Sequence, residues 1–319
     1  MRILITGATG LVGSEIVRLC HTRGIAINYL TTRKDKIQKS DDFRGFLWNP
    51  AKDEIDPACF KGVGAIINLA GASISKRWTA SYKKEILASR VDSLRTLYRA
   101  LKQTNSTEIQ SFVSASAIGI YPSSQTQYYS ENEEGMDTSF LGEVVYKWEK
   151  EIAVFQSFDM AVAQIRVGLV MSGQGGALPE IAKPVGNYMG AALGTGQQWQ
   201  SWIHCTDLAR MFLFIVENGL QGTYNGVGPN PVTNSKLVRE IAKVMERPLF
   251  LPNIPKFAIR LLLGEMAYLL FASQRVSSKK IEEEGFVFNF RNICRTLEHI
   301  YGEETPKSTQ TVIQKEFLS

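Results

Sequence analysis

The chain has 319 residues, of which 44% are hydrophobic, and it contains 26 glycines and 11 prolines. These proportions predict a globular protein large enough for two structural units, and they exclude collagen-like, disordered and small disulfide-stapled chains. The 36 Lys and Arg residues and the 31 Asp and Glu residues give a formal charge of +5, spread along the chain. This modest excess weakly favours a small anionic ligand and gives little support for nucleic-acid binding.

The cysteine pattern and the apolar segments indicate a cytoplasmic protein. Cys20, Cys59, Cys205 and Cys294 form neither a CxxC pair nor a metal-ligand spacing, so we expect reduced, mostly buried thiols. With three histidines in the chain, a metal site is not expected. The chain start lacks the pattern of a signal peptide. The longest apolar run, 261–272, is shorter than the roughly 20 residues that a bilayer requires, so we expect no membrane segment.

The N-terminal part of the chain alternates between short β-branched runs and segments with helical periodicity. An apolar run at 2–5 is followed by a glycine-rich stretch and then a helical pattern, which predicts a strand, a turn and a helix. Further strands are expected at 26–31, 64–68, 111–114 and 161–171, and helices at 81–102 and 142–155. This alternation predicts an α/β fold with a doubly wound parallel sheet of the Rossmann type.

Beyond Met171 the composition of the chain changes, and glycine-rich loops appear. Two glycine-dense loops, at 172–176 and 190–196, bracket a short segment that contains prolines, and loops of this length usually carry function or disorder. Helices are then expected at 205–217, 235–246, 255–272 and 290–301. The residues from 302 to the end are polar and are expected to be frayed.

The glycine-rich stretch after the first strand has the spacing of a dinucleotide-binding turn. Gly7 permits the tight turn, Gly10 lets a ligand approach the backbone, and Gly13 lets the helix pack closely on the strand. The backbone amides at the start of the helix would then hold a pyrophosphate. The alternative is a turn without a ligand. The expected contacts are Gly7, Thr9, Gly10, Leu11, Val12 and Gly13.

The end of the second strand bears on the choice of dinucleotide. An acidic residue about 20 residues after the glycines would bind the ribose of NAD, whereas an Arg accommodates the 2′-phosphate of NADP. The chain has Thr32 and Arg33 there, followed by Lys34, with no acid before Asp35. We therefore expect NADP(H), because Arg can bind a phosphate through two charge-assisted hydrogen bonds. The alternative is a solvated Arg-Lys pair in a loop.

The end of the 64–68 strand and the helix after it supply further candidates. Leu69, Ala70 and Gly71 are small or apolar residues at the place where a cofactor would cross the carboxyl edge of the sheet. Simple packing is the alternative, but the glycine motif favours contact with the ribose or diphosphate of the cofactor. On the helix, Glu85 and Arg90 are five residues apart and do not share one face. Arg90 could reach a phosphate, or it could be an ordinary surface Arg.

A Ser and a Tyr-x-x-x-Lys sequence are candidates for proton transfer. Ser116 lies near the end of a predicted strand, and Tyr146 and Lys150 lie on the next helix at i and i+4, so they face the same way. An ammonium near a phenol favours the phenolate. Such a Tyr could exchange a proton with a substrate hydroxyl while a nicotinamide exchanges the hydride. The alternative is a Tyr on a half-buried helix beside an exposed Lys.

The segment 194–207 is dense in amide and aromatic side chains, which suit a sugar or another flat polar ligand. His204 has no partner in the sequence, so a structural role is favoured over a catalytic one. Asp207 directly precedes a helical pattern, which is typical of a helix-start acid. Trp78 is either a core residue or a wall of the substrate site.

Together, the motifs GATGLVG, NLAG, SASAIG, YKWEK and WIHCTDLA resemble the extended short-chain dehydrogenase/reductases. More narrowly, the chain resembles the NAD-dependent epimerase/dehydratase-like "epimerase family" proteins that carry a C-terminal domain of unassigned function. The resemblance runs from Met1 to about Tyr301 and includes KRWTASYKKEILASR, GGALPEI, LGTGQQWQSWIH and PKFAIRLLLGEMA. It implies that the residues lining an NADP site are Thr32, Arg33, Leu69, Ala70, Glu85, Arg90 and Val170.

The resemblance also implies a domain organisation. An NADP-binding Rossmann domain would span 1–170 and be completed by about 201–230. A smaller, mostly helical substrate-binding lobe would comprise 171–200 and 231–301, and a polar tail would follow at 302–319. Members of this branch often lack the Tyr-x-x-x-Lys sequence, whereas this chain has both Tyr146 and Lys150.

These observations predict a cytoplasmic NADP-dependent oxidoreductase or sugar-nucleotide epimerase-like enzyme. Its partner would be a small-molecule substrate, with a nucleotide sugar as one candidate, and it would be a monomer or homodimer without nucleic acid or membrane. The alternative is a non-catalytic NADP(H)-binding redox sensor or scaffold, in which the loops from 172 to 196 act as a switch.

Overall fold

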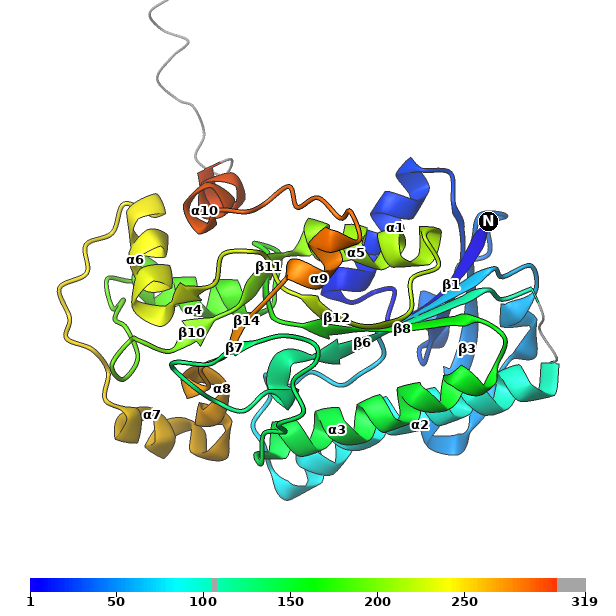
Figure 1. Ribbon diagram of the computed structural model, residues 1–319, viewed down its shortest axis with the longest axis horizontal. Coiled ribbons are helices and arrows are strands. Elements are labelled where there is room, and N and C mark those ends of the chain that lie inside the picture. Colours follow the sequence, from blue (N-terminus) through cyan, green and yellow to red (C-terminus); the bar gives the residue numbers. More distant parts are fainter. Residues whose placement is uncertain (105–107, 303–319) are drawn as a thin grey trace, which may run out of the picture.

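The computed structural model describes residues 1–104 and 108–302, and the predicted polar tail lies outside them from residue 303 on. Its centre is an eight-stranded sheet in the order β12-β8-β6-β5-β1-β2-β3-β4 (Figure 1). Every neighbouring pair runs parallel except β3 and β4 at one edge. The strands are β1 (Arg2–Thr6), β2 (Ala26–Thr31), β3 (Phe43–Asn49), β4 (Glu54–Ile55), β5 (Ala65–Asn68), β6 (Ser111–Ala117), β8 (Ala161–Val167) and β12 (Gly222–Gly226).

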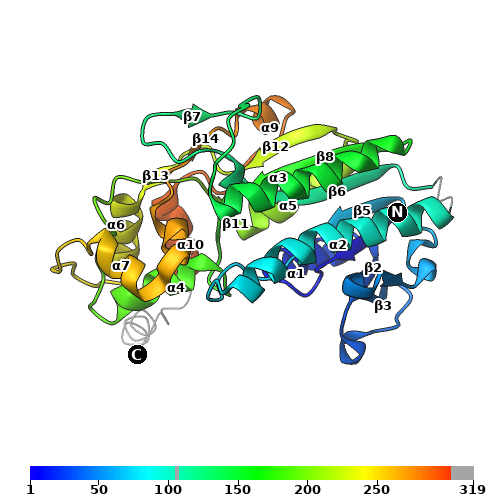
Figure 2. The ribbon, with the colours of Figure 1, turned by 90° about the horizontal axis from the view of Figure 1, so that it is seen from below.

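Two pairs of helices cover the two faces of this sheet (Figures 1 and 2). Helices α1 (Leu11–Thr22) and α5 (Cys205–Glu217) share a core with the side chains on one face of the strands, Ile3 and Ile5 among them. Helices α2 (Ala80–Thr104) and α3 (Phe140–Ala153) share a second core with the opposite face, which includes Leu4. Successive strand residues thus pack alternately against the two helix layers. The predicted doubly wound Rossmann-type sheet is confirmed.

Strand β1 lies between β2 and β5 in the sheet, so the order of the strands reverses beside it. In open parallel sheets, the crevice outside the carboxyl ends of the strands at such a reversal is where ligands bind. The turn after β1 and the loop after β5 border this crevice. Both carry residues that the sequence nominates as cofactor contacts.

A separate apolar core lies beyond the carboxyl edge of the sheet. It joins α4 (Ala177–Gly186), α6 (Asn234–Val244) and α10 (Ile293–Gly302), with Trp202 and Leu237 fully buried in it. Short ladders connect this part to the sheet. They pair β9 (Leu169–Met171) with β11 (Trp202–His204), β10 (Trp199–Gln200) with β13 (Val232–Thr233), and β7 (Tyr128–Tyr129) with β14 (Arg275–Val276). Helix α9 (Lys279–Glu283) packs near β12.

Glycines account for two differences from the expected elements. The strand expected over 161–171 divides into β8 and β9 at Gly168, where a Cβ would lie 2.4 Å from the carbonyl oxygen of Ser201. The helix expected over 255–272 divides into α7 (Lys256–Leu263), a 3-10 turn and α8 (Tyr268–Phe271), because Gly264, with a φ of 59°, interrupts the helical backbone.

A third difference concerns the segment between the glycine-rich loops. It forms α4, with Pro179 in its first turn and Pro184 inside it, where the sequence indicated only a short segment with prolines.

Among the described residues, no helix combines the length and the apolar character needed to cross a membrane.

Candidate cofactor and substrate site

The turn between β1 and α1 has a geometry that only glycine permits. Gly7 has a φ of 71°, a backbone conformation that costs L side chains energy. A Cβ on Gly13 would lie 2.1 Å from the carbonyl oxygen of Gly7, so the helix can approach the strand only without a side chain there. The N-cap of α1 is Gly10, which has no side chain to accept hydrogen bonds from the first amides of the helix. These amides, around Leu11 and Val12, are therefore suited to an anionic ligand.

A chain of buried hydrogen bonds fixes the neighbouring loop against this turn. The hydroxyl of Thr6 donates to Oδ1 of Asn68 at 2.7 Å, and Nδ2 of Asn68 donates to the hydroxyl of Ser114 at 3.0 Å. The backbone amides of Leu69 and Ala70 donate to Oγ1 of Thr6, both at 3.0 Å. Three adjacent strands, β1, β5 and β6, are thus held in register at their carboxyl ends, where the nominated loops begin.

Residues after β2 place exposed cations beside the same crevice. The backbone amide of Arg33 donates to the hydroxyl of Thr31 at 3.2 Å. The Arg33 side chain is 64% exposed and binds Asp35 through Nη2 at 2.6 Å. This hydrogen bond with Arg33 holds the pKa of Asp35 below its ordinary value. A phosphate at Arg33 would therefore compete with the Asp35 carboxylate.

Arg90 is the most unusual cation of the site. Its Nη1 atom donates to the carbonyl oxygens of Ile86 (2.9 Å) and Ala72 (3.2 Å), and its guanidinium lies 5.0 Å from the ring centroid of Trp148. No carboxylate forms an ion pair with it within residues 1–104 and 108–302. Burial lowers its pKa to about 10. A Cβ on Gly71 would lie 3.1 Å from the guanidinium carbon, so the loop after β5 packs directly on this cation.

Arg90 lines a cavity of about 200 Å³ at the carboxyl edge of the sheet. From α3, the walls include Leu141, Val144 and Val145, and from the far side they include Gln200 and Gln274. The cavity is mostly apolar, with a few amide groups on the side away from α3. Such a cavity can exclude water from a bound ring and leave hydrogen-bonding groups for a substrate.

The hydroxyl of Ser116 does not open into this cavity. Ser116 is buried, and its hydroxyl donates to Oε1 of Glu149 at 2.6 Å. Arg166 binds both carboxylate oxygens of Glu149, at 2.9 and 2.8 Å. Glu149 and Arg166 thus form a buried bidentate ion pair that joins α3 to β8 and engages the Ser116 hydroxyl. The Ser116 hydroxyl is therefore engaged by Glu149, and its polarising role stays a prediction.

Tyr146 and Lys150 share a face of α3, as their spacing predicts, and Nζ of Lys150 lies 4.4 Å from the Tyr146 ring centroid. That face borders a shallow depression that also contains Gln164 from the amino half of β8. Tyr146 follows Val145 by about 100° around the helix axis, so it is turned away from the Arg90 cavity. The structure therefore does not bring the predicted Ser-Tyr-Lys set together at the carboxyl edge of the sheet.

The remaining nominated residues lie at different distances from the crevice. Val170, on β9, packs against the core beside α1. A Cβ on Gly176 would lie 3.1 Å from the Leu11 side chain and 3.8 Å from the Val170 carbonyl oxygen, so the loop at 172–176 lies over the glycine turn. Glu85 is exposed on α2 and is not among the residues that line the Arg90 cavity.

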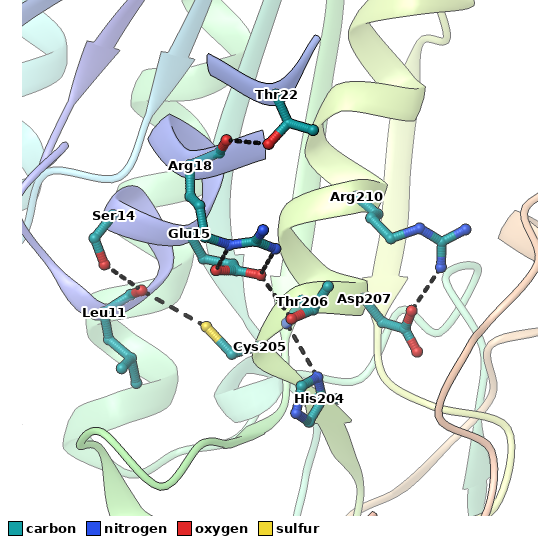
Figure 3. A network of polar contacts seen from close by, with 10 residues as sticks. All are labelled: Leu11, Ser14, Glu15, Arg18, Thr22, His204, Cys205, Thr206, Asp207 and Arg210. Atoms are coloured by element: carbon teal, nitrogen blue, oxygen red, sulfur yellow. Dashed lines mark hydrogen bonds and ion pairs between the residues drawn. The ribbon is translucent and has the colours of Figure 1, made fainter. Parts of the chain in front are cut away.

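The start of α5 is bonded to the start of α1 (Figure 3). The thiol of Cys205 contacts the carbonyl oxygen of Leu11 at 3.6 Å, and the hydroxyl of Thr206 donates to Oε1 of Glu15 at 2.6 Å. Glu15 also binds Arg18, and mainly this bond lowers the pKa of the Glu15 carboxyl. These contacts position the first turn of α1 from outside the glycine turn.

His204 and Asp207 have the structural roles that the sequence favoured. His204 is the N-cap of α5 and accepts a hydrogen bond from the amide of Thr206 through Nδ1 at 3.2 Å. Its ring stacks on Phe290 at 3.8 Å, and burial lowers its pKa to about 4. Asp207 is fully buried and accepts from the backbone amides of Asn289 (3.1 Å) and Phe290 (2.8 Å), which ties the chain before α10 to α5.

A larger cavity, of about 530 Å³, adjoins the first through a shared wall residue, Tyr268. Trp78 lines it and lies edge-on to Phe140 at 5.3 Å, so the Trp is a cavity wall. From α7, the lining includes Lys256 and Arg260. Neither cation is among the site residues predicted from the sequence. Their signal was present as two basic residues, four apart, in an otherwise apolar helical run.

Comparison with known proteins gives matches along most of the chain. The NAD dependent epimerase/dehydratase family matches residues 3–148, and a domain of unknown function, DUF1731, matches residues 254–300. An epimerase family protein of Staphylococcus aureus is 35% identical over 301 residues, which are 94% of this chain and 99% of that protein.

Two solved structures are similar over 95% of this chain. One is human epimerase family protein SDR39U1 with NADPH, which is 25% identical, has a TM-score of 0.82 and is covered to 99%. The other is a nucleoside-diphosphate sugar epimerase from Corynebacterium glutamicum, which is 26% identical, has a TM-score of 0.75 and is covered to 58%. The predicted resemblance is confirmed, and the chain belongs to the NAD-dependent epimerase/dehydratase family.

Proposed function

We propose that this chain is an NADP(H)-binding enzyme of the oxidoreductase or sugar-nucleotide epimerase-like type. The observation that carries the proposal is Arg90, a partly buried cation without a carboxylate partner in the described parts of the chain, beside the strand reversal. Removing a charge from water costs free energy unless a counter-ion or hydrogen bonds compensate. An anionic ligand across the glycine turn and the 69–71 loop supplies that compensation.

The nicotinamide cofactor fits the residues at the sheet edge. Gly7, Gly10 and Gly13 leave room for a pyrophosphate, and the first amides of α1 would hydrogen-bond it. Thr32 and Arg33 would hold a 2′-phosphate, which favours NADP(H) over NAD(H). The human relative, whose structure is described as containing NADPH, supports this choice.

When bound, the cofactor supplies or accepts a hydride. The chain's own groups would orient the nicotinamide and the substrate for that transfer and exclude water from them. Leu141 and Val145 would cover one side of the cavity, while Gln200 and Gln274 offer hydrogen bonds on the other. The second apolar core, built on α4, α6 and α10, would form the substrate lobe, at 171–200 and 231–301. The Corynebacterium relative, named a nucleoside-diphosphate sugar epimerase, makes a nucleotide sugar one candidate substrate.

One observation favours the alternative of a non-catalytic NADP(H) sensor. The side of α3 that faces the cavity carries Leu141, Val144, Val145 and Trp148, and none of these can exchange a proton. In a sensor, the cofactor would instead set the position of the 172–176 loop over Leu11. We rank the sensor function below the enzyme, because the two adjoining cavities leave space for a substrate beside the cofactor.

Calorimetric titration of the purified chain with NADPH and NADH tests the cofactor. We expect micromolar binding of NADPH and weaker binding of NADH, and we expect Arg33→Gln to remove most of that difference. Failure to bind NADPH, or a preference for NADH, would reject the assignment. Incubating the NADPH complex with nucleotide sugars, aldehydes and quinones then separates the two functions. Oxidation of NADPH by any of them supports an enzyme, and inertness with tight binding supports the sensor.

A further inference from the structure

The larger cavity combines aromatic walls with an unbalanced positive charge. Trp78, Phe140 and Phe271 line it, so aromatic rings form part of the wall of its volume of about 530 Å³. This is the size range of sites that bind small organic molecules. The cavity lies between α7 and α8 on one side and the first turns of α2 and α3 on the other.

Three cations and one carboxylate line this cavity. Lys83 binds Glu265 through Nζ at 2.6 Å, so these two charges compensate each other. Lys256 lies over the ring of Phe271, with Nζ 5.4 Å from the ring centroid. No carboxylate forms an ion pair with Lys256 or Arg260 anywhere in residues 1–104 and 108–302. Two positive charges are therefore left for a ligand.

The helix that carries these cations leaves both its charged residues and several large apolar residues exposed. Surface helices normally turn apolar residues inward and charged residues to solvent. On α7, Lys256 and Arg260 line the cavity and are both exposed to solvent, and Phe257 is 74% exposed and Leu261 is 89% exposed. Lys256 and Arg260 are four residues apart and so lie on one face of the helix. Two like charges on one face repel each other, and a ligand with a negative group would offset that repulsion.

We propose that this cavity binds the anionic end of the substrate, a phosphate or carboxylate group on a flat organic body. Lys256 and Arg260 would bind the oxyanion, and Trp78, Phe140 and Phe271 would contact the body. Because Tyr268 lines both cavities, the other end of such a molecule would reach the Arg90 cavity. The inference rests on the proposed function in taking the ligand to be the substrate, whereas the anion site itself can be measured independently.

The test uses three small probes that share a ring and differ in charge: phenyl phosphate, benzoate and benzyl alcohol. Each is titrated by calorimetry into the full chain with saturating NADPH, which occupies the phosphate sites at the glycine turn and Arg33. We expect at least one of the two anions to bind on the order of tenfold or more tightly than benzyl alcohol. Tighter binding of phenyl phosphate would indicate a phosphate site, and tighter binding of benzoate would indicate a carboxylate site. Equal binding of all three probes would overturn the proposal.

A matched pair of double variants locates the site. Lys256→Gln with Arg260→Gln should weaken the preferred anion on the order of tenfold or more and leave benzyl alcohol and NADPH unchanged. Lys236→Gln with Arg239→Gln removes the same charge from exposed positions on α6 and should change none of these affinities. Unchanged anion binding in the first variant, or an equal loss in both, would contradict the proposal. If NADPH does not bind, the titrations without it still report on the anion site, so this proposal and the cofactor assignment can fail separately.

Discussion

The guanidinium of Arg90 lies 5.0 Å from the ring centroid of Trp148 and beside Gly71, without a carboxylate partner among the described residues. We expect Arg90→Met to weaken NADPH binding about tenfold or more, because it removes charge-assisted hydrogen bonds to the ligand. The free energy of unfolding should change by less than about 1 kcal/mol, since the Met can still pack on Trp148, and the loss of two hydrogen bonds to carbonyl oxygens is offset by the removal of a desolvated charge that has no carboxylate partner. Calorimetry and urea unfolding measure the two effects.

The control for this substitution is Arg95→Met on the same helix. Arg95 is 55% exposed and binds Glu151, so its loss should leave NADPH affinity unchanged. Equal loss of affinity in both variants would indicate a general charge effect. A strong loss of stability in Arg90→Met with unchanged NADPH affinity would make Arg90 a structural residue.

Gly13→Ala should destabilise the folded chain. The added Cβ would lie 2.1 Å from the Gly7 carbonyl oxygen, so α1 must move away from β1, at a cost of about 1–3 kcal/mol. Urea unfolding at neutral pH measures this change. The control is Gly64→Ala, where the nearest atom to the new Cβ is the flexible Met1 side chain at 3.6 Å. Two variants of equal stability would show that the turn adapts easily.

Asp35→Asn should raise NADPH affinity. In the free chain, the Asp35 carboxylate binds the Arg33 guanidinium through both oxygens, at 2.6 and 3.2 Å, and so competes with a 2′-phosphate. Removing this exposed competing carboxylate should raise the affinity for NADPH about two- to fivefold. NADH, which lacks the 2′-phosphate, should bind both forms equally. A gain for NADH of the same size would place the effect elsewhere than at the 2′-phosphate.

The stability of the chain should fall below pH 6.5 because of His204. Burial lowers the pKa of His204 to about 4 in the folded chain, whereas an unfolded His titrates near 6.5. Between these values the unfolded state binds the extra proton, so stability decreases as the pH falls. From pH 6.5 to pH 5, this group should cost about 2 kcal/mol. His204→Asn keeps an N-cap side chain and should lose that dependence, whereas His21→Asn, at an exposed position, should retain it. Urea unfolding at the two pH values gives the comparison.

Most of the sheet could be predicted from local patterns. The glycine turn and the apolar runs placed β1, β2 and β5 within a residue or so, since parallel strands buried on both faces appear as continuous apolar runs. Strand β3, next to the edge strand β4, was not predicted because its sequence, FRGFLWN, mixes charge, glycine and aromatics. The break in the strand at Gly168 was not predicted. Its cause is the close approach of the Ser201 carbonyl oxygen, which is a contact between distant parts of the chain.

The site could be predicted only in part, for a similar reason. Residues at strand ends, such as Gly71, are placed by topology once the sheet is known. The orientation of Arg90 against Trp148, and the engagement of Ser116 by Glu149 and Arg166, depend on how α2 and α3 pack together. No short pattern encodes that packing. The i, i+4 rule correctly aligned Tyr146 with Lys150 but carries no information on which side of α3 meets the cavity.

Tyr146→Phe should leave NADPH binding and the turnover of any substrate unchanged. The phenol is on a side chain that is 42% exposed, on the face of α3 beside Gln164, so it cannot reach a ring bound in the Arg90 cavity without rotation of the helix. The matched substitution is Val145→Phe, one residue away and inside that cavity, where the larger ring should reduce turnover on the order of tenfold or more by displacing the substrate. Steady-state rates of NADPH oxidation with the best substrate compare the two. Loss of turnover in Tyr146→Phe with intact NADPH binding would restore the Tyr146-Lys150 pair as the proton-transfer group and require that α3 turn in the complex.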